Sequence, residues 1–458
     1  MKSYDVVVVG AGSGGIMAAI TARRFYPDKS ILVIRKDPLV TIPCGIPYIY
    51  GTYGTPEKDL VPIDRSFERN RLEGLVDKVL HIDRSQHIVT TYNNEKIGYQ
   101  KLVLATGAEP LIPPLPGVEM QNIFTIRKTV PYLYYLLDAM NQAQSLCIVG
   151  CGYIGVEFAE ESRKGRPNLA ITVVEMVDHC LQQAYDEEIS VKIEEALVGM
   201  NINLMLGARV EAFLGEGKVE KVRLVSGAEI DADMVILGLG VQPEIELARE
   251  TGLMVGPTKA IQVDRYMRTS DPDIFACGDC AEKLSFFDES PANVRLASVA
   301  SLEGRIAGSN LFKQNRVHVG TIGVVSTVVG GTAFASAGLT EAQARAKGYD
   351  VVVADAGSIN RHPRAMPGVG KIVVKLVFDR KNMTVLGGQV WGAESGGEII
   401  NIISGCIQHQ MTADDIATYQ IGTHPALTAS AAVYPLVEAA EIALQKQQEL
   451  SSGEALLD

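Results

Sequence analysis

One cysteine lies in a segment whose composition suits redox chemistry. Pro47 lies where a first helical turn can begin, because that turn tolerates a missing N–H, and this predicts Cys44 near a helix N-terminus. The helix dipole there favours the thiolate, the nucleophilic form of cysteine. The alternative is that Cys44 is a small buried apolar residue. The segment reads Thr41-Ile42-Pro43-Cys44-Gly45-Ile46-Pro47-Tyr48.

A glycine turn precedes this cysteine. An apolar run over residues 4–9 leads into the turn at 10–15, and an alanine-rich helical pattern follows over 16–24. This order binds the pyrophosphate of a dinucleotide, since glycine lets the backbone approach the phosphates while helix N–H groups face them. A second strand over 31–34 ends at Arg35, where the ribose is recognised.

The same arrangement recurs further along the chain. Residues 146–149 lead into a second glycine turn at 150–155, and the next strand ends at Glu175. The first glycine and the ribose position are 25 residues apart in both copies, from 10 to 35 and from 150 to 175. Two dinucleotide folds imply two dinucleotides, which favours a nucleotide redox enzyme over a simple binding module.

The two copies differ at the ribose position. Glu175 can accept hydrogen bonds from a free 2′-hydroxyl and would repel a 2′-phosphate, so the second site is predicted to prefer NADH to NADPH. Arg35 could bind a 2′-phosphate, stack on adenine or donate to ribose oxygens. The first nucleotide therefore has to be identified from other segments.

Further motifs extend this organisation. Buried strands over 101–108, 234–240 and 274–279 end in glycine turns, and the last releases Asp279, a carboxylate suited to a hydroxyl-rich chain. A small-residue helix is predicted over 293–308. From about Thr321 the pattern becomes β-rich and then helical, which predicts a separate α+β domain.

Composition limits the class of protein. The 458 residues suggest about three domains, and the net charge of -12 without a basic run argues against nucleic acid and anionic membrane surfaces. The N-terminus lacks the layout of a signal peptide, and no apolar run reaches the ~20 residues of a spanning helix. A cytoplasmic protein with small-molecule partners is expected.

The cysteines do not form an obvious framework. Seven cysteines at scattered spacings make a structural disulfide framework improbable. Cys277 and Cys280 form a lone C-x-x-C without further ligands at zinc spacing, and Cys147 and Cys151 flank a glycine motif. All four are interpreted as structural, and no metal site is predicted.

Together, these motifs resemble the FAD-dependent pyridine nucleotide-disulfide oxidoreductase family, in its branch with one catalytic cysteine. That branch includes coenzyme A disulfide reductases, NADH-dependent persulfide reductases, NADH oxidases and NADH peroxidases. The resemblance covers essentially the whole chain and rests on both glycine turns, Glu175, the turn at 105–107 and the turn at 277–279. Cys44 lies where the branch keeps its redox cysteine.

The resemblance implies an α/β fold with two Rossmann-like domains, for FAD and NADH, and a C-terminal α+β dimerisation domain. The implied boundaries are 1–115 and 246–320 for the FAD domain, 116–245 for the NAD(P)H domain and 321–458 for the interface domain. The protein would be a homodimer. The implied catalytic residues are Cys44, His424, Tyr153 and Glu157, with Tyr153 as the aromatic gate for nicotinamide. The implied cofactor-binding residues are Gly10, Gly12, Ser13, Gly14, Gly15, Arg35, Ala105, Thr106, Gly107, Gly150, Gly152, Tyr153, Ile154, Gly155, Glu175, Gly240, Gly278, Asp279 and Ala297.

Several positions depart from the family pattern. Arg35 replaces the glutamate usual at the FAD ribose, and no second cysteine follows Cys44. Ser13 stands where the oxidases and peroxidases carry a histidine. His424 and Pro425 resemble the acid–base pair of two-cysteine relatives. Without the family, His424 would be read as a surface-turn histidine, Tyr153 as a turn aromatic and Glu157 as part of a solvated helix face.

The leading hypothesis is an enzyme in which electrons pass from NADH through FAD to Cys44, which attacks a small disulfide or persulfide. One alternative is an NADH oxidase, with Cys44 cycling through a sulfenate. Another is a nucleotide-dependent redox sensor in which oxidation of Cys44 changes a partner-binding surface. A membrane quinone reductase is disfavoured because the C-terminal end is acidic.

Overall fold

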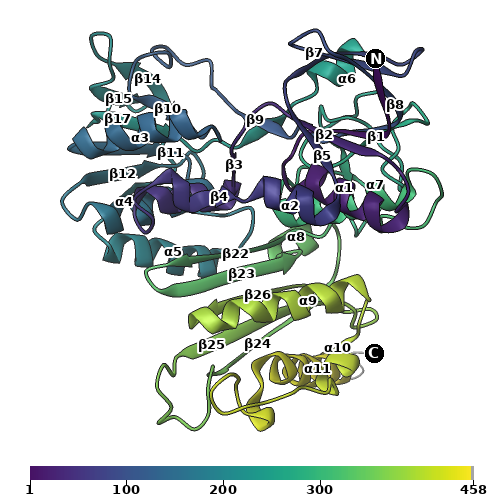
Figure 1. The fold of residues 1–458 in the computed structure, drawn as a ribbon. Coiled ribbons are helices and arrows are strands. Elements are labelled where there is room, and N and C mark those ends of the chain that lie inside the picture. The colour runs from purple at the N-terminus through teal and green to yellow at the C-terminus, as the bar shows by residue number, and fades with distance from the viewer. Residues whose placement is uncertain (455–458) are drawn as a thin grey trace. The chain divides into compact units, whose positions relative to one another are not determined.

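The computed structural model describes residues 1–454, which divide into two compact units (Figure 1). The first unit comprises Met1–Pro114, Phe124–Gln142 and Leu239–Thr321. The second comprises 115–123, 143–238 and the described chain from Ile322 onward. Each unit is thus assembled from segments that are far apart in sequence.

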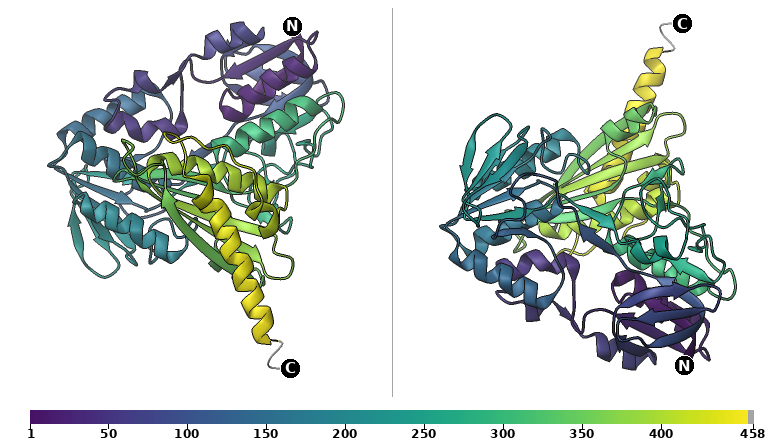
Figure 2. Two further views of the ribbon diagram at one scale, coloured as in Figure 1. Left: turned by 90° about the horizontal axis from the view of Figure 1, so that it is seen from below. Right: turned by 90° about the horizontal axis from the view of Figure 1, so that it is seen from above.

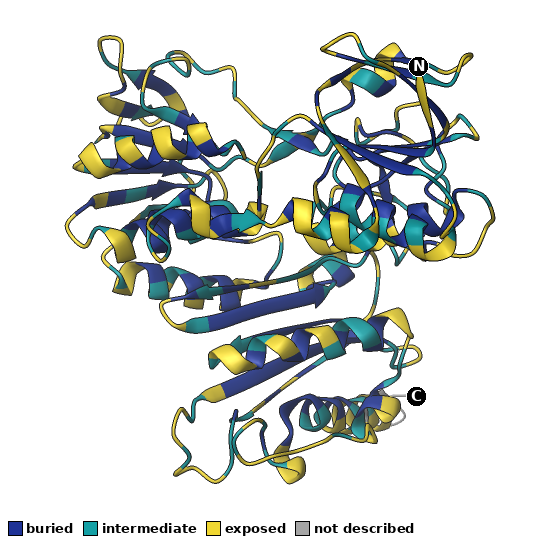
Figure 3. Ribbon diagram, viewed as in Figure 1, coloured by how far each residue is buried: buried dark blue, intermediate teal, exposed yellow. Residues whose placement is uncertain are grey.

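A mostly parallel sheet forms the core of the first unit. Its order is β5-β2-β1-β8-β7-β6, and β19 also pairs with β8. β1 lies between two parallel neighbours and is mostly buried, which explains its unbroken apolar run (Figure 3). The strands are β1 (Lys2–Val9), β2 (Ile31–Arg35), β5 (Glu73–Val76), β6 (Val79–Asp83), β7 (Ile88–Thr91), β8 (Lys96–Leu104) and β19 (Ile274–Ala276).

Two helices pack closely in this unit, α1 (Ser13–Phe25) and α7 (Ala297–Asn310). A Cβ atom added at Gly304 would lie 2.3 Å from the Gly14 oxygen, and one at Gly308 would lie 2.3 Å from the Ala18 oxygen. The two glycines therefore allow backbone contact between the helices. The predicted small-residue helix is α7, which begins a few residues later than expected.

The cysteine segment forms a short, tightly connected group. β3 (Val40–Thr41) pairs antiparallel with β4 (Leu60–Val61), and two 3-10 helices lie between them, η1 (Pro43–Tyr50) and η2 (Pro56–Asp59). The helix begins at Pro43, earlier than the predicted start near Pro47, because proline is favoured at the first helical position and Pro43 already occupies it. Helices α2 (Ile63–Asn70) and α3 (Val130–Gln142) also belong to this unit.

The second unit contains the second nucleotide fold. Its sheet includes four parallel strands in the order β17-β11-β12-β13. A small antiparallel sheet, β14-β15-β16, accompanies it. The elements are β11 (Ser145–Val149), α4 (Tyr153–Gly165), β12 (Ala170–Val174), α5 (Glu187–Gly199), β13 (Asn203–Met205), β14 (Val210–Leu214), β15 (Lys221–Leu224), β16 (Glu229–Asp231) and β17 (Met234–Leu237).

The C-terminal part of the second unit is a five-stranded antiparallel sheet in the order β22-β23-β26-β25-β24. Helix α11 packs on β24 and β25, and Figure 2 shows it as the long yellow helix near the C-terminus. The predicted change to β-rich and then helical structure is confirmed. The elements are β22 (Val324–Val329), β23 (Thr332–Gly338), α8 (Glu341–Ala346), β24 (Val351–Ile359), β25 (Lys371–Asp379), β26 (Val385–Gly392), η3 (Glu394–Glu398), α9 (Ile399–Gln408), α10 (Ala413–Ala417), η4 (Ala431–Val433) and α11 (Pro435–Glu454).

A buried polar cluster joins the nucleotide fold to this antiparallel sheet. Lys375 Nζ lies 3.0 Å from Asp186 Oδ2, and the Gln389 amide donates to the same carboxylate. All three side chains are buried. Since each member has a partner, the cluster fixes the segment before α5 against β25 and β26.

The remaining short elements are β9 (Ala108–Pro110), β10 (Ile123–Thr125), β18 (Val241–Pro243), α6 (Glu246–Glu250), β20 (Lys283–Leu284) and β21 (Pro291–Ala292). Among the described residues, none of the helices has the length and apolar composition needed to span a bilayer.

Candidate active site

Cys44 is exposed and is the second residue of η1. Within the described chain, the other cysteines outside a disulfide, Cys147, Cys277, Cys280 and Cys406, are buried. Burial raises the pKa of the Cys147 thiol to about 12. It also raises the pKa values of the Cys277, Cys280 and Cys406 thiols above their usual value. Cys44 is therefore the thiol that a solute can reach.

The first glycine turn has the shape of a phosphate cradle. Gly10 has φ +110°, and an added Cβ there would lie 2.1 Å from the Ala105 oxygen, so this position requires glycine. Nothing lies within 4 Å of the Cβ position of Gly12, which leaves that side open. Ser13 begins α1, and Gly14 and Gly15 are buried within it. The turn fits the pyrophosphate of FAD.

The turn after β8 closes the same sheet edge. Thr106 Oγ1 donates to the Glu244 oxygen at 2.6 Å, and Leu111 N–H donates to the Gly240 oxygen at 3.0 Å. Gly107 and Gly240 both adopt positive φ, which glycine accommodates without strain. These bonds join the strand ends near residues 106 and 240 within the first unit.

Asp279 follows β19 at this edge. Its Oδ1 atom is buried and has no hydrogen-bond partner among the described residues. Ala297, the first residue of α7, is exposed. A buried carboxylate oxygen without a partner fits the hydroxyl groups of a ribityl chain, so the residues present suit FAD.

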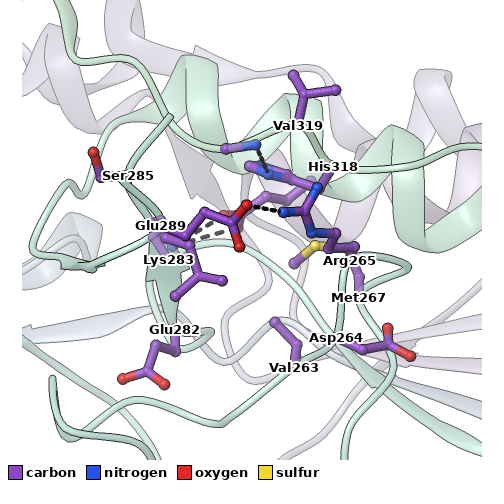
Figure 4. Close-up of a pocket in the computed structure, with 13 residues that line it drawn as sticks. Val263, Asp264, Arg265, Met267, Glu282, Lys283, Ser285, Glu289, His318 and Val319 are labelled. Carbon is purple, nitrogen blue, oxygen red and sulfur yellow. Dashed lines mark hydrogen bonds and ion pairs between the residues drawn. The ribbon is translucent and has the colours of Figure 1, made fainter. Parts of the chain in front are cut away.

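A small cavity of about 30 Å³ is lined in part by Lys283 and Glu303, and Figure 4 shows Lys283 at its edge. Lys283 and Glu303 form a buried pair at 3.3 Å, and both bind the turn: Gly278 N–H donates to Glu303 at 2.7 Å and Lys283 donates to the Gly278 oxygen at 2.7 Å. Burial raises the pKa of Glu303 to about 7. Sequence reasoning missed this pair, because partners twenty positions apart form no recognisable motif.

Arg35 is buried, and its side chain contacts residues of the first unit. Its guanidinium donates to Asp64 at 2.8 Å and lies 5.3 Å from the ring centre of Phe67. Both partners belong to α2. Arg35 therefore anchors α2 to the end of β2 at the ribose position.

The second glycine turn is held by the predicted ribose carboxylate. Glu175 accepts from Cys151 N–H at 2.7 Å and from Met176 N–H at 2.7 Å. Gly155 is buried, whereas Gly152 has nothing within 4 Å of its Cβ position and Ile154 is partly exposed. The turn, with Gly150 at positive φ, repeats the geometry of the first.

Cys151 forms a disulfide with Cys180. The scattered spacing of the cysteines makes a disulfide framework improbable and Cys151 is interpreted as structural, but this bond is not predicted from the sequence. The loop after β12 returns to the glycine turn, where Leu181 N–H donates to the Cys151 oxygen at 3.0 Å, and this contact brings the cysteines together. Sequence spacing carried no signal of it, because the pairing depends on the path of the loop.

Tyr153 and Glu157 lie on the first two turns of α4. The ring of Tyr153 is 6.4 Å from that of Tyr185, and burial raises the pKa of the Tyr153 hydroxyl well above its usual value. Burial, helped by the charges of Glu160 and Glu161, raises the pKa of Glu157 to about 7. A half-buried acid whose pKa is raised toward neutrality is typical of functional sites.

His424 is exposed in the loop before α11. Its Nδ1 accepts a hydrogen bond from Ala426 N–H at 3.2 Å. In the neutral ring the proton is therefore on Nε2, which can donate outward.

The predicted residues fall into two groups. Cys44, the first glycine turn, Arg35 and Asp279 belong to the first unit, whereas Tyr153, Glu157, Glu175 and His424 belong to the second. Within the described chain, no cluster of three or more side chains suited to hold a metal ion is found.

Residues 4–304 match the model of the pyridine nucleotide-disulphide oxidoreductase family. The chain belongs to this family. Residues 324–433 of this pyridine nucleotide-disulphide oxidoreductase match the family's dimerisation domain. The predicted α/β fold, enzyme class and cofactors, FAD and NADH, are thereby confirmed.

Named relatives carry two activities. The oxidoreductase is 32% identical to an NADH oxidase of Enterococcus faecalis, over 90% of this chain and 93% of that protein. It is 32% identical to an NAD(P)H coenzyme A polysulfide/persulfide reductase of Pyrococcus horikoshii, over 85% of this chain and 87% of that protein. The structure of an NAD-dependent persulfide reductase from A. fulgidus matches with a TM-score of 0.89 and 30% identity, over 97% of this chain and 84% of that one.

Proposed function

We propose that this protein is an FAD-dependent enzyme that uses NADH to reduce a small disulfide or persulfide, of the coenzyme A type, through Cys44. The observation that carries the proposal is the exposed thiol in the first turn of η1, in the unit that also holds the FAD turn. Persulfide and polysulfide reductases among the relatives support it.

The chain's own residues divide the work. Cys44 attacks the substrate sulfur, and the partner subunit's His424 protonates the leaving thiolate. Tyr153 covers the nicotinamide site until NADH enters, and Glu157 lies beside it. Bound FAD would supply the two-electron path from NADH to sulfur. The glycine turns, the turn at 105–107, Gly240, Asp279 and Ala297 would hold the two dinucleotides.

Assembly and location complete the proposal. The chain forms a homodimer through residues 321–458, with the FAD domain at 1–115 and 246–320 and the NADH domain at 116–245. It acts in the cytoplasm, without a nucleic-acid or membrane partner. The match to a dimerisation domain supports the assembly.

NADH oxidase activity is the second candidate, and the Enterococcus faecalis relative supports it. Sulfur is favoured over oxygen by Ser13, which stands where oxidases and peroxidases of the resembled branch have a histidine. Serine cannot supply near-neutral proton exchange to a peroxide or sulfenate. Oxygen reduction is therefore expected as slow leakage.

The deciding experiment is anaerobic NADH oxidation with coenzyme A disulfide, glutathione disulfide, polysulfide and persulfides, compared with oxygen as sole acceptor. Cys44→Ser should retain bleaching of the flavin absorbance by NADH and lose sulfur turnover. If this variant kept wild-type turnover, or if oxygen were the fastest acceptor, the oxidase function would replace the proposal. Absence of turnover with every acceptor would favour the redox sensor.

Nucleotide preference tests the role of Glu175. Replacing Glu175 with serine removes the carboxylate that would repel a 2′-phosphate, so the ratio of kcat/KM for NADPH over NADH should rise by at least about tenfold. Absolute rates should fall with both nucleotides, because Glu175 also holds Cys151 N–H. Measured kcat/KM values for both nucleotides give the ratio, and an unchanged ratio contradicts the assignment.

A further inference from the structure

Asp59 is a buried acid beside the turn that carries Cys44. It is the last residue of η2 and is 1% exposed. Neither carboxylate oxygen has a hydrogen-bond partner in the described part of the chain. Buried carboxyl groups are normally hydrogen-bonded or paired, because an isolated charge is costly to remove from water. An unpaired acid here therefore requires an explanation.

Two contacts place Asp59 against the cysteine turn. Ile42 N–H donates to the backbone oxygen of Asp59 at 3.0 Å. A Cβ atom added at Gly45 would lie 1.9 Å from Asp59 Oδ1. The carboxyl group thus occupies the space that a side chain at position 45 would fill, directly after Cys44.

Other charged groups around η2 are engaged elsewhere. Lys58 Nζ donates to the Tyr53 oxygen at 2.8 Å, and the exposed Glu57 accepts from the Thr55 and Tyr134 hydroxyls. None of the ion pairs in the described structure includes Asp59. Burial raises the pKa of Asp59 to about 6, and the Ile42 amide opposes part of this increase. The titratable groups on η1, η2 and α3, which pack together around it, are Cys44, Tyr48, Tyr50, Glu57, Lys58, Tyr132, Tyr134, Tyr135 and Asp138.

We propose that Asp59 and Cys44 together hold one negative charge near neutral pH, so that Asp59 is the proton reservoir of the redox cysteine. Two negative charges at this turn would repel each other, and one group therefore stays protonated while the other is ionised. Asp59 acts through the ionisation of Cys44, as a positioning residue. The inference rests on the proposed function of Cys44.

The reservoir fits the proton balance of disulfide reduction. When the Cys44 thiolate attacks a disulfide, the substrate S–S bond breaks, a mixed disulfide forms and a thiolate leaves. Cys44 is then neutral, Asp59 ionises, and the proton that it releases balances protonation of the leaving thiolate. Two electrons from NADH break the mixed disulfide, after which the Cys44 thiolate returns and Asp59 regains a proton. Overall, one disulfide, one NADH and one proton give two thiols and NAD⁺.

The test measures the pH dependence of Cys44 alkylation by iodoacetamide in the FAD-loaded protein, with the modified peptide quantified by mass spectrometry. Asp59→Asn keeps the size of the side chain and removes its charge, so the apparent pKa of Cys44 should fall by about one pH unit. Glu57→Gln removes an exposed charge from the same 3-10 helix and should leave the profile unchanged. An unchanged profile for Asp59→Asn, or equal shifts in both variants, overturns the proposal.

A second measurement uses the wild-type protein and covers the case in which Asp59→Asn does not fold. Infrared difference spectra recorded near pH 6 should lose one protonated-carboxyl band when Cys44 is converted to a mixed disulfide. No loss of that band would overturn the proposal. Neither test requires turnover. Each can therefore fail while the Cys44→Ser experiment still supports the proposed function, and each can succeed while that experiment contradicts it.

Discussion

Glu157 on α4 has a pKa that is raised toward physiological pH. Its pKa is raised to about 7 by burial and by the charges of Glu160 and Glu161, and a hydrogen bond to Thr327 opposes the shift. An exposed glutamate titrates near about 4.3. The folded protein therefore holds the proton of Glu157 over a pH range in which the unfolded chain has lost it.

Replacing Glu157 with glutamine should alter the pH dependence of stability. The pKa of Glu157 is higher in the folded protein than in the unfolded chain, so binding of its proton stabilises the folded state. This stabilisation is fully present below the pKa of the unfolded chain and is lost as pH rises through about 7. Glu157→Gln should thus be more stable than wild type at pH 8, on the order of 2 kcal/mol, and similar near pH 4. Urea unfolding at several pH values measures this. Exposed Glu195→Gln on α5 is the control, and a parallel offset at every pH would contradict the prediction.

Among the elements, the contact between α1 and α7 depends most directly on residue size. Gly308→Ala would place a methyl group 2.3 Å from the Ala18 oxygen, so the helices must separate. Such overpacking typically costs about 1–3 kcal/mol. Because α1 follows the first glycine turn, FAD retention should fall as well. Thermal unfolding and the ratio of flavin to protein absorbance measure both effects.

Gly405→Ala on α9 is the matched control for this prediction. Nothing lies within 4 Å of its Cβ position, and alanine is the better helix former by about 1 kcal/mol. The control should therefore be neutral or stabilising. Equal destabilisation by the two substitutions would mean that the α1–α7 contact is not the cause.

The disulfide joins the second glycine turn to the loop after β12. Cys180→Ser removes this link beside Glu175, so the loop should sample more conformations and the dissociation constant for NADH should rise severalfold. Fluorescence titration with NADH measures the change. Cys406→Ser, which alters a buried thiol of α9, is the control, and equal NADH affinity in wild type and Cys180→Ser would contradict the prediction.

At the scale of the whole molecule, a mixed dimer tests whether His424 acts across subunits. If each site uses Cys44 of one chain and His424 of the other, a dimer of Cys44→Ser and His424→Ala subunits contains one site with neither substitution. It should recover about half of the wild-type activity per dimer. Differently tagged subunits allow purification of the mixed dimer. Activity no higher than the average of the two parent variants would place both residues in one subunit's site.

Sequence patterns predicted most of the architecture because its key parts are local. Each glycine turn lies between the strand and helix that it connects, so the nucleotide folds could be predicted from the sequence around Gly10 and Gly150 alone. The disulfide of Cys151, the Lys283–Glu303 pair and the burial of Asp59 depend on how separated segments return to one place. No local sequence pattern encodes these contacts, and only the folded structure shows them.

The first unit also has a consequence for how the protein is made. The strand β19 that completes its sheet pairs with β8, although more than a third of the chain is synthesised between them. At about 5–20 residues per second on a ribosome, the early strands wait roughly 8–34 seconds with the β8 edge uncovered. The nascent first unit is therefore expected to need protection by chaperones until residue 321 has emerged, and flavin can be captured only after that point.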